Sequence, residues 1–306
     1  MIIVHNRGTY TVSAFAETGD YWRIAAWPAL NRSAWAVLRT HTTTVQNGDG
    51  SHFLAPSDVD FFLWQMEQRK VLKCRQDLAR KLRRDHPENY ESPVLNTNVV
   101  HWLAQFRDIL YAIRVRPILS SGTLLGWYRD CGVIPYTTDV DMTVVAREYT
   151  PKLGQVWKWR DGFFLKSVSG KPSDSFMLNV YKGNIKFDLF LLYEEENKTW
   201  HGGLGSISTK TKLRWDYPKL SGVCSADLGG HLFAVPCNVE EFLVMNYGEN
   251  WKEPEPHFSW DTSPRNIHEI GNWNNSEWRT VFWESLFSSF MPEVLAAFTS
   301  LSLTLY

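Results

Sequence analysis

Residues 120–142, SSGTLLGWYRDCGVIPYTTDVDM, place a glycine turn ahead of two aspartates that are one residue apart. The stretch begins at the end of a short apolar strand, RPILSSG, and continues into a helical segment, TLLGWYRDCG, which we expect Gly132 to close. A strand with alternating faces, TTDVDMTVVA, follows. Residues i and i+2 of a strand point to the same side, so Asp139 and Asp141 are expected to project together.

The chemistry of this stretch suits a phosphate held by a metal. Two adjacent carboxylates repel each other unless one is protonated or a cation lies between them, and oxygen-rich sites suit Mg²⁺ or Mn²⁺. Upstream, a glycine lets the backbone approach a ligand, and free amides at a helix start bind anions. We therefore expect Ser121, Gly122 and Thr123 to bind donor phosphates, although an ordinary turn and strand edge also fit the pattern.

A third acid, Asp188, lies inside the apolar segment IKFDLFLLY. A lone buried carboxylate is costly unless it is paired or binds a metal. Asp188 is therefore expected to join Asp139 and Asp141 as a catalytic and metal-binding residue, the alternative being a strand edge that faces solvent.

Composition excludes some classes of protein. The chain has 306 residues, 44% of them hydrophobic and 21% charged, which is typical of a globular protein. Its formal net charge of −1 gives no electrostatic case for nucleic acid as a partner. The apolar patch at the N-terminal residues is short and is not expected to be a signal peptide or a membrane anchor, and the apolar run over residues 281–306 is expected to be a buried or docking helix.

Four cysteines are too few for a disulfide scaffold in a chain of this length. Cys224 and Cys237 bracket Gly229-Gly230, which could turn a hairpin and bring the two thiols together. A disulfide there stays open at this level, because it requires an oxidising compartment. The spacing of the two cysteines and His231 does not fit a structural zinc site.

The pattern predicts two domains. Residues 1 to about 55 contain short strand-like runs, and a basic helical pattern extends from Asp58 to about Arg84. The basic face is expected to be solvated, with an anionic ligand or a membrane surface as the alternative. After the proline-containing HPENYESP, we expect the N-terminal module of unclear role, residues 1–95, to give way to a catalytic domain, residues 96–306.

Strands and helices are mixed without regular alternation in the second domain. An amphipathic helix is expected over residues 98–114, two strands joined by a tight turn over 175–193, and a helix in VEEFLVMNYG. This order predicts an α+β fold, with a mixed sheet flanked by helices.

The glycine turn, Asp-x-Asp and a later in-strand aspartate follow the order of the nucleotidyltransferase superfamily. Within it, GTLLGWYRDCGVIPYTTDVDM resembles the core motif of the LicD family, and its fukutin-like members most of all. The resemblance continues through FDLFLLYEEENKTWHGG, VPCNVEEFLVMNYGENWKEP and WDTSPRNIHEIGNWNNSEW, and covers roughly residues 97–280. Bacterial LicD-type motifs carry a further acid where this chain has Thr138, which argues against choline transfer of the bacterial kind.

The resemblance implies a metal-dependent transferase of the nucleotidyltransferase fold, with Mg²⁺ or Mn²⁺ held by Asp139, Asp141 and Asp188. The donor would be CDP-ribitol, the acceptor an O-linked mannose-type glycan of a glycoprotein, and CMP the product. Tyr128 and Arg129 would face the donor, although a helix-surface arginine is an equal alternative. The family also implies the Golgi or another secretory-pathway lumen. Two other functions stay open, a nucleotidyltransferase acting on an NTP and a non-catalytic glycan-binding homologue.

Overall fold

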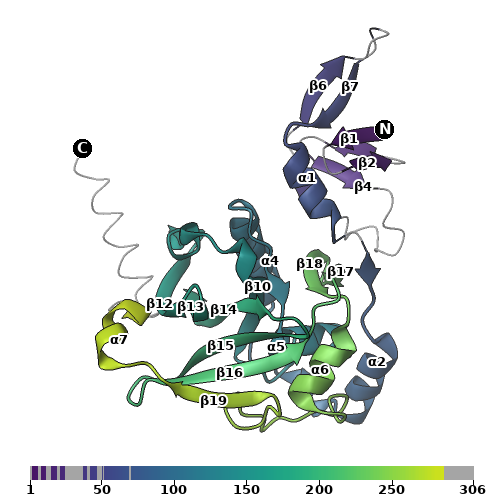
Figure 1. Ribbon diagram of the computed structural model, residues 1–306. Coiled ribbons are helices and arrows are strands. Elements are labelled where there is room, and N and C mark those ends of the chain that lie inside the picture. Colours follow the sequence, from purple (N-terminus) through teal and green to yellow (C-terminus); the bar gives the residue numbers. More distant parts are fainter. Residues whose placement is uncertain are drawn as a thin grey trace, which may run out of the picture.

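The computed structural model describes residues 70–285 without a break, together with residues 52–68, Gly50 and short strands between residues 2 and 46. The N-terminal strands pair with one another in small antiparallel sheets, which confirms the expected module of short strands. In Figure 1 those that carry a label lie at the top, apart from the large sheet. The strands are β1 (Ile2–His5), β2 (Gly8–Thr11), β3 (Phe15–Thr18), β4 (Tyr21–Ile24), β5 (Val37–Arg39), β6 (Thr42–Gln46) and β7 (His52–Pro56).

The large sheet combines parallel and antiparallel pairs, as expected for an α+β fold. Its strand order is β11 (Lys158–Arg160), β12 (Phe163–Lys171), β13 (Asp174–Lys182), β14 (Ile185–Glu194), β10 (Asp139–Val145), β9 (Ile118–Leu119), β18 (His231–Pro236), β17 (Val223–Leu228) and β8 (Val71–Leu72). The end of β14 also pairs with β15 (Lys198–Ser206), which continues through β16 (Thr211–Pro218) to β19 (Ile267–Asn272). This second set of strands lies below the first in Figure 1.

Helix α4 (Val99–Tyr111) covers the apolar face of the central strands. The ring of Phe106 stacks on Phe187 of β14 at 5.3 Å between centroids, and on Trp157 at 4.5 Å. Val140, the partner of Phe187 in the parallel register, is also buried. Since side chains alternate along a strand, the residues on either side of Val140 and Phe187 point to the opposite face.

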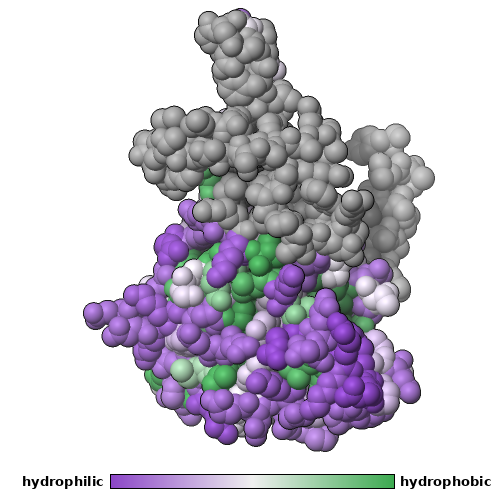
Figure 2. All heavy atoms as spheres, turned by 90° about the vertical axis from the view of Figure 1, so that its right-hand side faces the viewer, coloured by the Kyte–Doolittle hydropathy of each residue, from purple (hydrophilic) through white to green (hydrophobic). Residues whose placement is uncertain are grey.

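The remaining helices are short, and in Figure 1 the labelled ones lie around the large sheet except the first, which lies with the N-terminal strands. They are α1 (Val59–Met66), α2 (Gln76–Asp85), α3 (Glu88–Glu91), α5 (Ser121–Leu125), the π-helical turn η1 (Gly126–Asp130), the 3₁₀ turns η2 (Ala146–Glu148) and η3 (Pro151–Gly154), α6 (Val239–Tyr247) and α7 (Asn275–Val281). Within the described residues, every helix is too short or too polar to cross a lipid bilayer. Hydrophilic residues cover most of the described surface in Figure 2, around a patch of hydrophobic ones.

The basic helix expected from Asp58 to about Arg84 is divided in two. Helix α1 ends at Met66, and β8 (Val71–Leu72) pairs in parallel with β17 before α2 begins. Pairing with the main sheet outweighs helical periodicity at this point. The basic face of α2 also contacts protein, because Arg83 donates a hydrogen bond to the carbonyl of Asp130.

Both pairs of cysteines form disulfides. Cys224–Cys237 joins β17 to the end of β18, across the hairpin that Gly229 and Gly230 turn with φ values of 57° and 84°. The second bond, Cys74–Cys131, was not anticipated, because its cysteines are 57 residues apart and no local pattern links them.

The expected domain boundary between residues 95 and 96 stays a prediction. Strand β8 belongs to the main sheet, and Cys74 is bonded to the end of η1. We therefore propose that the second domain begins near residue 70 rather than at residue 96.

Two predictions of where a helix ends or begins differ from the structure. The helical segment of the quoted stretch stops at Cys131, which adopts the left-handed φ of 52°, rather than at Gly132. Phe282–Glu284 forms strand β20 along β12 instead of starting a helix, because it pairs with Ser167 to Ser169. The rest of the expected C-terminal helix lies outside the described residues.

Gly126, where α5 passes into η1, has no room for a side chain. A Cβ atom there would lie 2.9 Å from both the carbonyl oxygen of Gly132 and the amide nitrogen of Ile134. Both are backbone atoms, so we expect Gly126→Ala to lower the free energy of unfolding by about 1–3 kcal/mol in chemical denaturation. Gly132→Ala is the matched control, since its Cβ would meet only the Asp130 carbonyl, at 3.9 Å. Equal stability of the two variants would contradict this account of the turn.

Candidate active site

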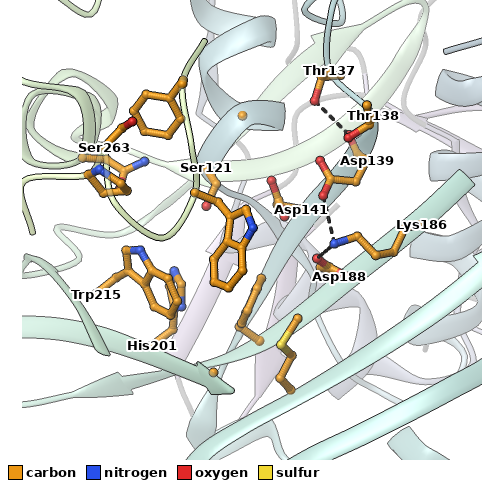
Figure 3. Close-up of a pocket in the computed structure, with 18 of the residues that line it drawn as sticks. Ser121, Thr137, Thr138, Asp139, Asp141, Lys186, Asp188, His201, Trp215 and Ser263 are labelled. Carbon is orange, nitrogen blue, oxygen red and sulfur yellow. Dashed lines mark hydrogen bonds and ion pairs between the residues drawn. The ribbon is translucent and has the colours of Figure 1, made fainter. Parts of the chain in front are cut away.

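Three acids meet on the face of the central strands opposite α4. The parallel register pairs Asp141 with Asp188 and Asp139 with Lys186. Each aspartate offers a carboxylate oxygen that lies within 4.8 Å of those of the other two. In Figure 3 the three side chains point toward one another. The set could hold a metal ion, because carboxylate oxygens are the ligands that hard divalent cations prefer.

Lys186 and Asn179 contact the acids directly, and sequence reasoning missed both. The Lys186 Nζ atom lies 3.0 Å from Asp139 Oδ2 and 2.7 Å from Asp188 Oδ2. Asn179, on β13, donates a hydrogen bond of 2.6 Å to Asp188 Oδ1 and accepts one from Ser167. The spacing Lys-x-Asp places Lys186 and Asp188 on one face of their strand, so this contact had a signal in the sequence. The contact of Asn179 with Asp188 depends instead on how β13 pairs with β14.

The surroundings favour the protonated form of two of the acids. Burial raises the pKa of Asp141 well above its ordinary value, and the charges of Asp139 and Asp188 raise it further. Burial is also the main reason why the pKa of Asp188 is raised, against the lowering effect of Lys186. Although burial lowers it, these carboxylates raise the pKa of Lys186 above its ordinary value. The cluster therefore holds more negative charge than its environment tolerates without a cation.

The glycine turn lies directly against Asp141. A Cβ atom added to Gly122 would be 3.8 Å from Asp141 Oδ2, and the Gly122 backbone hydrogen-bonds the Asp141 carboxylate. Thr123 is buried, and its Oγ1 accepts a hydrogen bond of 2.8 Å from the Asp141 amide. The Thr123 hydroxyl therefore anchors β10, the strand that carries Asp139 and Asp141.

The predicted donor-binding residues divide into two groups. Ser121, Gly122 and Arg129 line the same cavity as the acids, whereas Thr123 and Tyr128 do not. The Tyr128 hydroxyl instead donates a hydrogen bond of 2.9 Å to Glu240, on α6.

Arg129 lies on the cavity wall but is almost fully buried. Its Nε atom is 2.9 Å from Asp130 Oδ2, and its Nη1 donates to the carbonyls of Trp251 and Glu253. Arg129 is therefore neither a solvent-exposed residue of the helix surface nor a freely accessible cation.

The cavity has a volume of about 1470 Å³ and two chemically different sides. The acids, Thr137 and Thr138 lie on one side of Figure 3, and Trp215 and His201 on the other. Further aromatic residues line the cavity, namely Tyr247, Trp251, Phe258 and Trp260. Trp251 is buried, while Trp260 is 55% exposed. The second side comes from β15, β16 and the loop that follows α6, parts of which lie in the segments that carry the family resemblance.

His201 is buried within this aromatic side. Its ring stacks on Trp215 and Tyr217 at centroid distances of 5.1 and 5.3 Å, and its Nε2 lies 3.1 Å from the Tyr217 hydroxyl. Burial lowers the pKa of His201 to about 3, so the ring is neutral in the folded protein at neutral pH.

A substitution at Thr123 tests whether this residue anchors Asp141. We expect Thr123→Val to lower the free energy of unfolding by about 1–3 kcal/mol, because the Asp141 amide loses its acceptor. Thr123→Ser keeps the hydroxyl and should recover most of that loss in urea denaturation. Loss of nucleotide binding at unchanged stability would instead place Thr123 against the donor.

The neutral His201 makes stability depend on pH. Below an ordinary histidine pKa of about 6.5 the unfolded chain binds a proton that the folded chain does not, so stability falls as pH drops toward 3. We expect the wild type to lose about 3 kcal/mol more than His201→Phe between pH 6.5 and 4, at ~1.4 kcal/mol per pH unit. Denaturation curves across this range measure the difference. The exposed His257→Phe is the control, and identical losses in wild type and His201→Phe would refute the assignment.

Comparison with known proteins confirms the family resemblance seen in the sequence. Residues 114–238 match the family described as LicD/FKTN/FKRP, nucleotidyltransferase domain. The chain is 33% identical over 236 residues to the mouse ribitol-5-phosphate transferase FKTN and 32% identical over 237 residues to the human one, with 76% of this chain and 50% of each relative aligned. An uncharacterized protein of Caenorhabditis elegans is 32% identical over 239 residues, which are 74% of this chain and 61% of that protein.

The chain thus spans between half and two thirds of the length of these relatives. The family match begins just before β9, ends just after β18, and includes the glycine turn and all three acids. The chain is a fukutin-like member of the LicD family, whose nucleotidyltransferase domain matches residues 114–238 of this chain.

Proposed function

We propose that this chain transfers ribitol 5-phosphate from CDP-ribitol to a hydroxyl group of a glycoprotein glycan and releases CMP. The observation that carries this proposal is the convergence of Asp139, Asp141 and Asp188 at one side of a cavity of about 1470 Å³. A cavity of that size has room for a nucleotide-linked donor together with part of an acceptor. The choice of donor is supported by the relatives named ribitol-5-phosphate transferases.

The three acids would hold Mg²⁺ or Mn²⁺, for which an all-carboxylate set of ligands is suited. When bound, the ion would neutralise charge on the donor phosphates and stabilise the charge that develops during transfer. Nearby, Ser121 and Gly122 lie on the same cavity wall and are the residues we propose for contact with the diphosphate. Thr123 and Tyr128 would act indirectly. Thr123 would hold Asp141 in place, and Tyr128 would contact α6.

In the proposed reaction, the acceptor oxygen attacks the phosphorus atom that bears the alditol. A new oxygen–phosphorus bond forms as the bond from that phosphorus to the CMP oxygen breaks. The hydroxyl proton passes to an ionised carboxylate, and Asp141 is the candidate because it lines the cavity beside the glycine turn. Asp188, which lines the same cavity, is the alternative acceptor of the proton. Arg129 would add a fixed positive charge behind the phosphates, shared with Asp130.

The aromatic side of the cavity would hold the uncharged parts of the substrates. Trp215 and Trp260 lie with ring centroids 6.2 Å apart, and Trp260 is the more exposed of the two. Flat aromatic surfaces bind bases and sugar rings through their apolar faces. We propose that the glycan acceptor approaches past Trp260.

The compartment follows from the redox state of the cysteines. Disulfides persist in oxidising surroundings and are rare in the cytosol, and this chain has two. We therefore propose the Golgi or another part of the secretory-pathway lumen.

Asp141→Asn tests the proposed function. The substitution removes a metal-binding and proton-accepting carboxylate while keeping the shape of the side chain, so we expect CMP release from CDP-ribitol with Mn²⁺ to fall by at least about 10³-fold. Product analysis by chromatography measures CMP, and circular dichroism checks that the fold is unchanged. The matched control is Asp216→Asn, an ion-paired aspartate outside the cavity, which should retain activity.

The same assay separates the alternatives. Turnover of an NTP with release of pyrophosphate would indicate a nucleotidyltransferase. Glycan binding that is indifferent to Mn²⁺, with no binding of any CDP-linked donor, would indicate a non-catalytic homologue. Undiminished CMP release by Asp141→Asn would refute the assignment of the acids.

A further inference from the structure

Lys186 occupies the position between two of the proposed metal-binding acids. It stands opposite Asp139 in the β10–β14 register and two residues before Asp188 on the same strand, so all three side chains share one face. Its ammonium group is 3.0 Å from Asp139 Oδ2 and 2.7 Å from Asp188 Oδ2 (Figure 3). The side chain is about a third exposed and lines the cavity.

The ammonium group uses carboxylate oxygens that a metal ion would need. Asp188 has one oxygen bonded to Asn179 and the other in contact with Lys186. Asp139 offers its Oδ2 to the same ammonium group. In this arrangement, a metal ion bound through Asp188 Oδ2 would share that oxygen with the ammonium group, and the two positive charges would repel each other.

Two other cations on the cavity wall have partners elsewhere. Arg129 is paired with Asp130, and Lys166 with Glu284. Of these three cations, Lys186 is thus the one that contacts the acid cluster. Its charge compensates part of the negative charge of the carboxylates.

We propose that Lys186 is a built-in counter-ion that competes with the divalent cation and moves onto the donor phosphates when that cation binds. The inference rests on the proposed metal-dependent function. Lysine suits the role because its charge is compact and its four-carbon stem is flexible. The stem starts on β14 at the cavity edge, so a rotation of the side chain moves the charge into the cavity while the strand stays in place.

Two consequences follow from the competition. In the free protein, the ammonium group weakens the binding of a divalent cation, because like charges repel over this short distance. A phosphate-bearing ligand gives the displaced ammonium group a new partner, so metal and nucleotide should strengthen each other's binding. By linkage, that strengthening is the same in both directions.

Calorimetric titration with Mn²⁺ alone tests the competition. We expect Lys186→Met, which keeps a long unbranched side chain and removes its charge, to bind Mn²⁺ about tenfold more tightly than the wild type. Lys198→Met is the matched control, because Lys198 also contacts two carboxylates, Glu195 and Asp216, but lies outside the cavity. Its Mn²⁺ affinity should equal that of the wild type.

A second titration includes CDP. The wild type should bind Mn²⁺ more tightly with CDP present than without it, and Lys186→Met should show a smaller gain. Lys186→Gln, which retains a hydrogen-bond donor but has no charge, should behave as Lys186→Met does and serves in its place if that variant does not fold. Mn²⁺ affinity in the uncharged variants equal to or weaker than that of the wild type would overturn the inference.

These measurements are independent of transfer activity. A wild type that binds Mn²⁺ but turns over no CDP-linked donor would defeat the proposed function and leave the role of Lys186 testable by the same titrations. A wild type that binds no Mn²⁺ would overturn the inference together with the metal site.

Discussion

The parallel pairing of β10 with β14 is the constraint on which the site depends. Val140 and Phe187 are partners in this register, and their burial against Phe106 of α4 fixes it. A slip of one residue would turn Phe187 into the cavity and an acid into the core, which costs several kcal/mol for an unpaired buried carboxylate. The apolar face of the sheet therefore determines where the acids stand on the other face.

The three acids are held close together although their negative charges repel one another. Asp141 and Asp188 have raised pKa values because burial and neighbouring charge disfavour their ionised forms. Backbone pairing, the Asn179 amide and the Lys186 ammonium group keep the side chains together. Such an arrangement weakens the fold locally and leaves a set of carboxylates that could hold a cation, a compromise common at functional sites.

The walls of the cavity come from segments that are distant in the chain. The turn at Gly126 and the Cys74–Cys131 bond position η1, which carries Arg129. Strand β16 supplies Trp215, and the loop after α6 supplies Trp260. One side of the cavity is thus made by the motif itself and the other by tertiary packing.

Local patterns in the sequence determined the α+β class, an amphipathic helix expected over 98–114 and found over 99–111, the strand alternation that aligns Asp139 with Asp141, and the cysteine pair that flanks a hairpin. These features depend on residues close in sequence, where periodicity and turn chemistry act directly. Strand pairing decided that Asp188 lies opposite Asp141 and that Asn179 contacts it, and it divided the basic helix at β8. Packing between other distant elements decided that Tyr128 of η1 contacts Glu240 of α6 and that Cys74 bonds to Cys131. Those contacts depend on the register and packing of distant segments, and such long-range choices leave no periodic signal in a single chain.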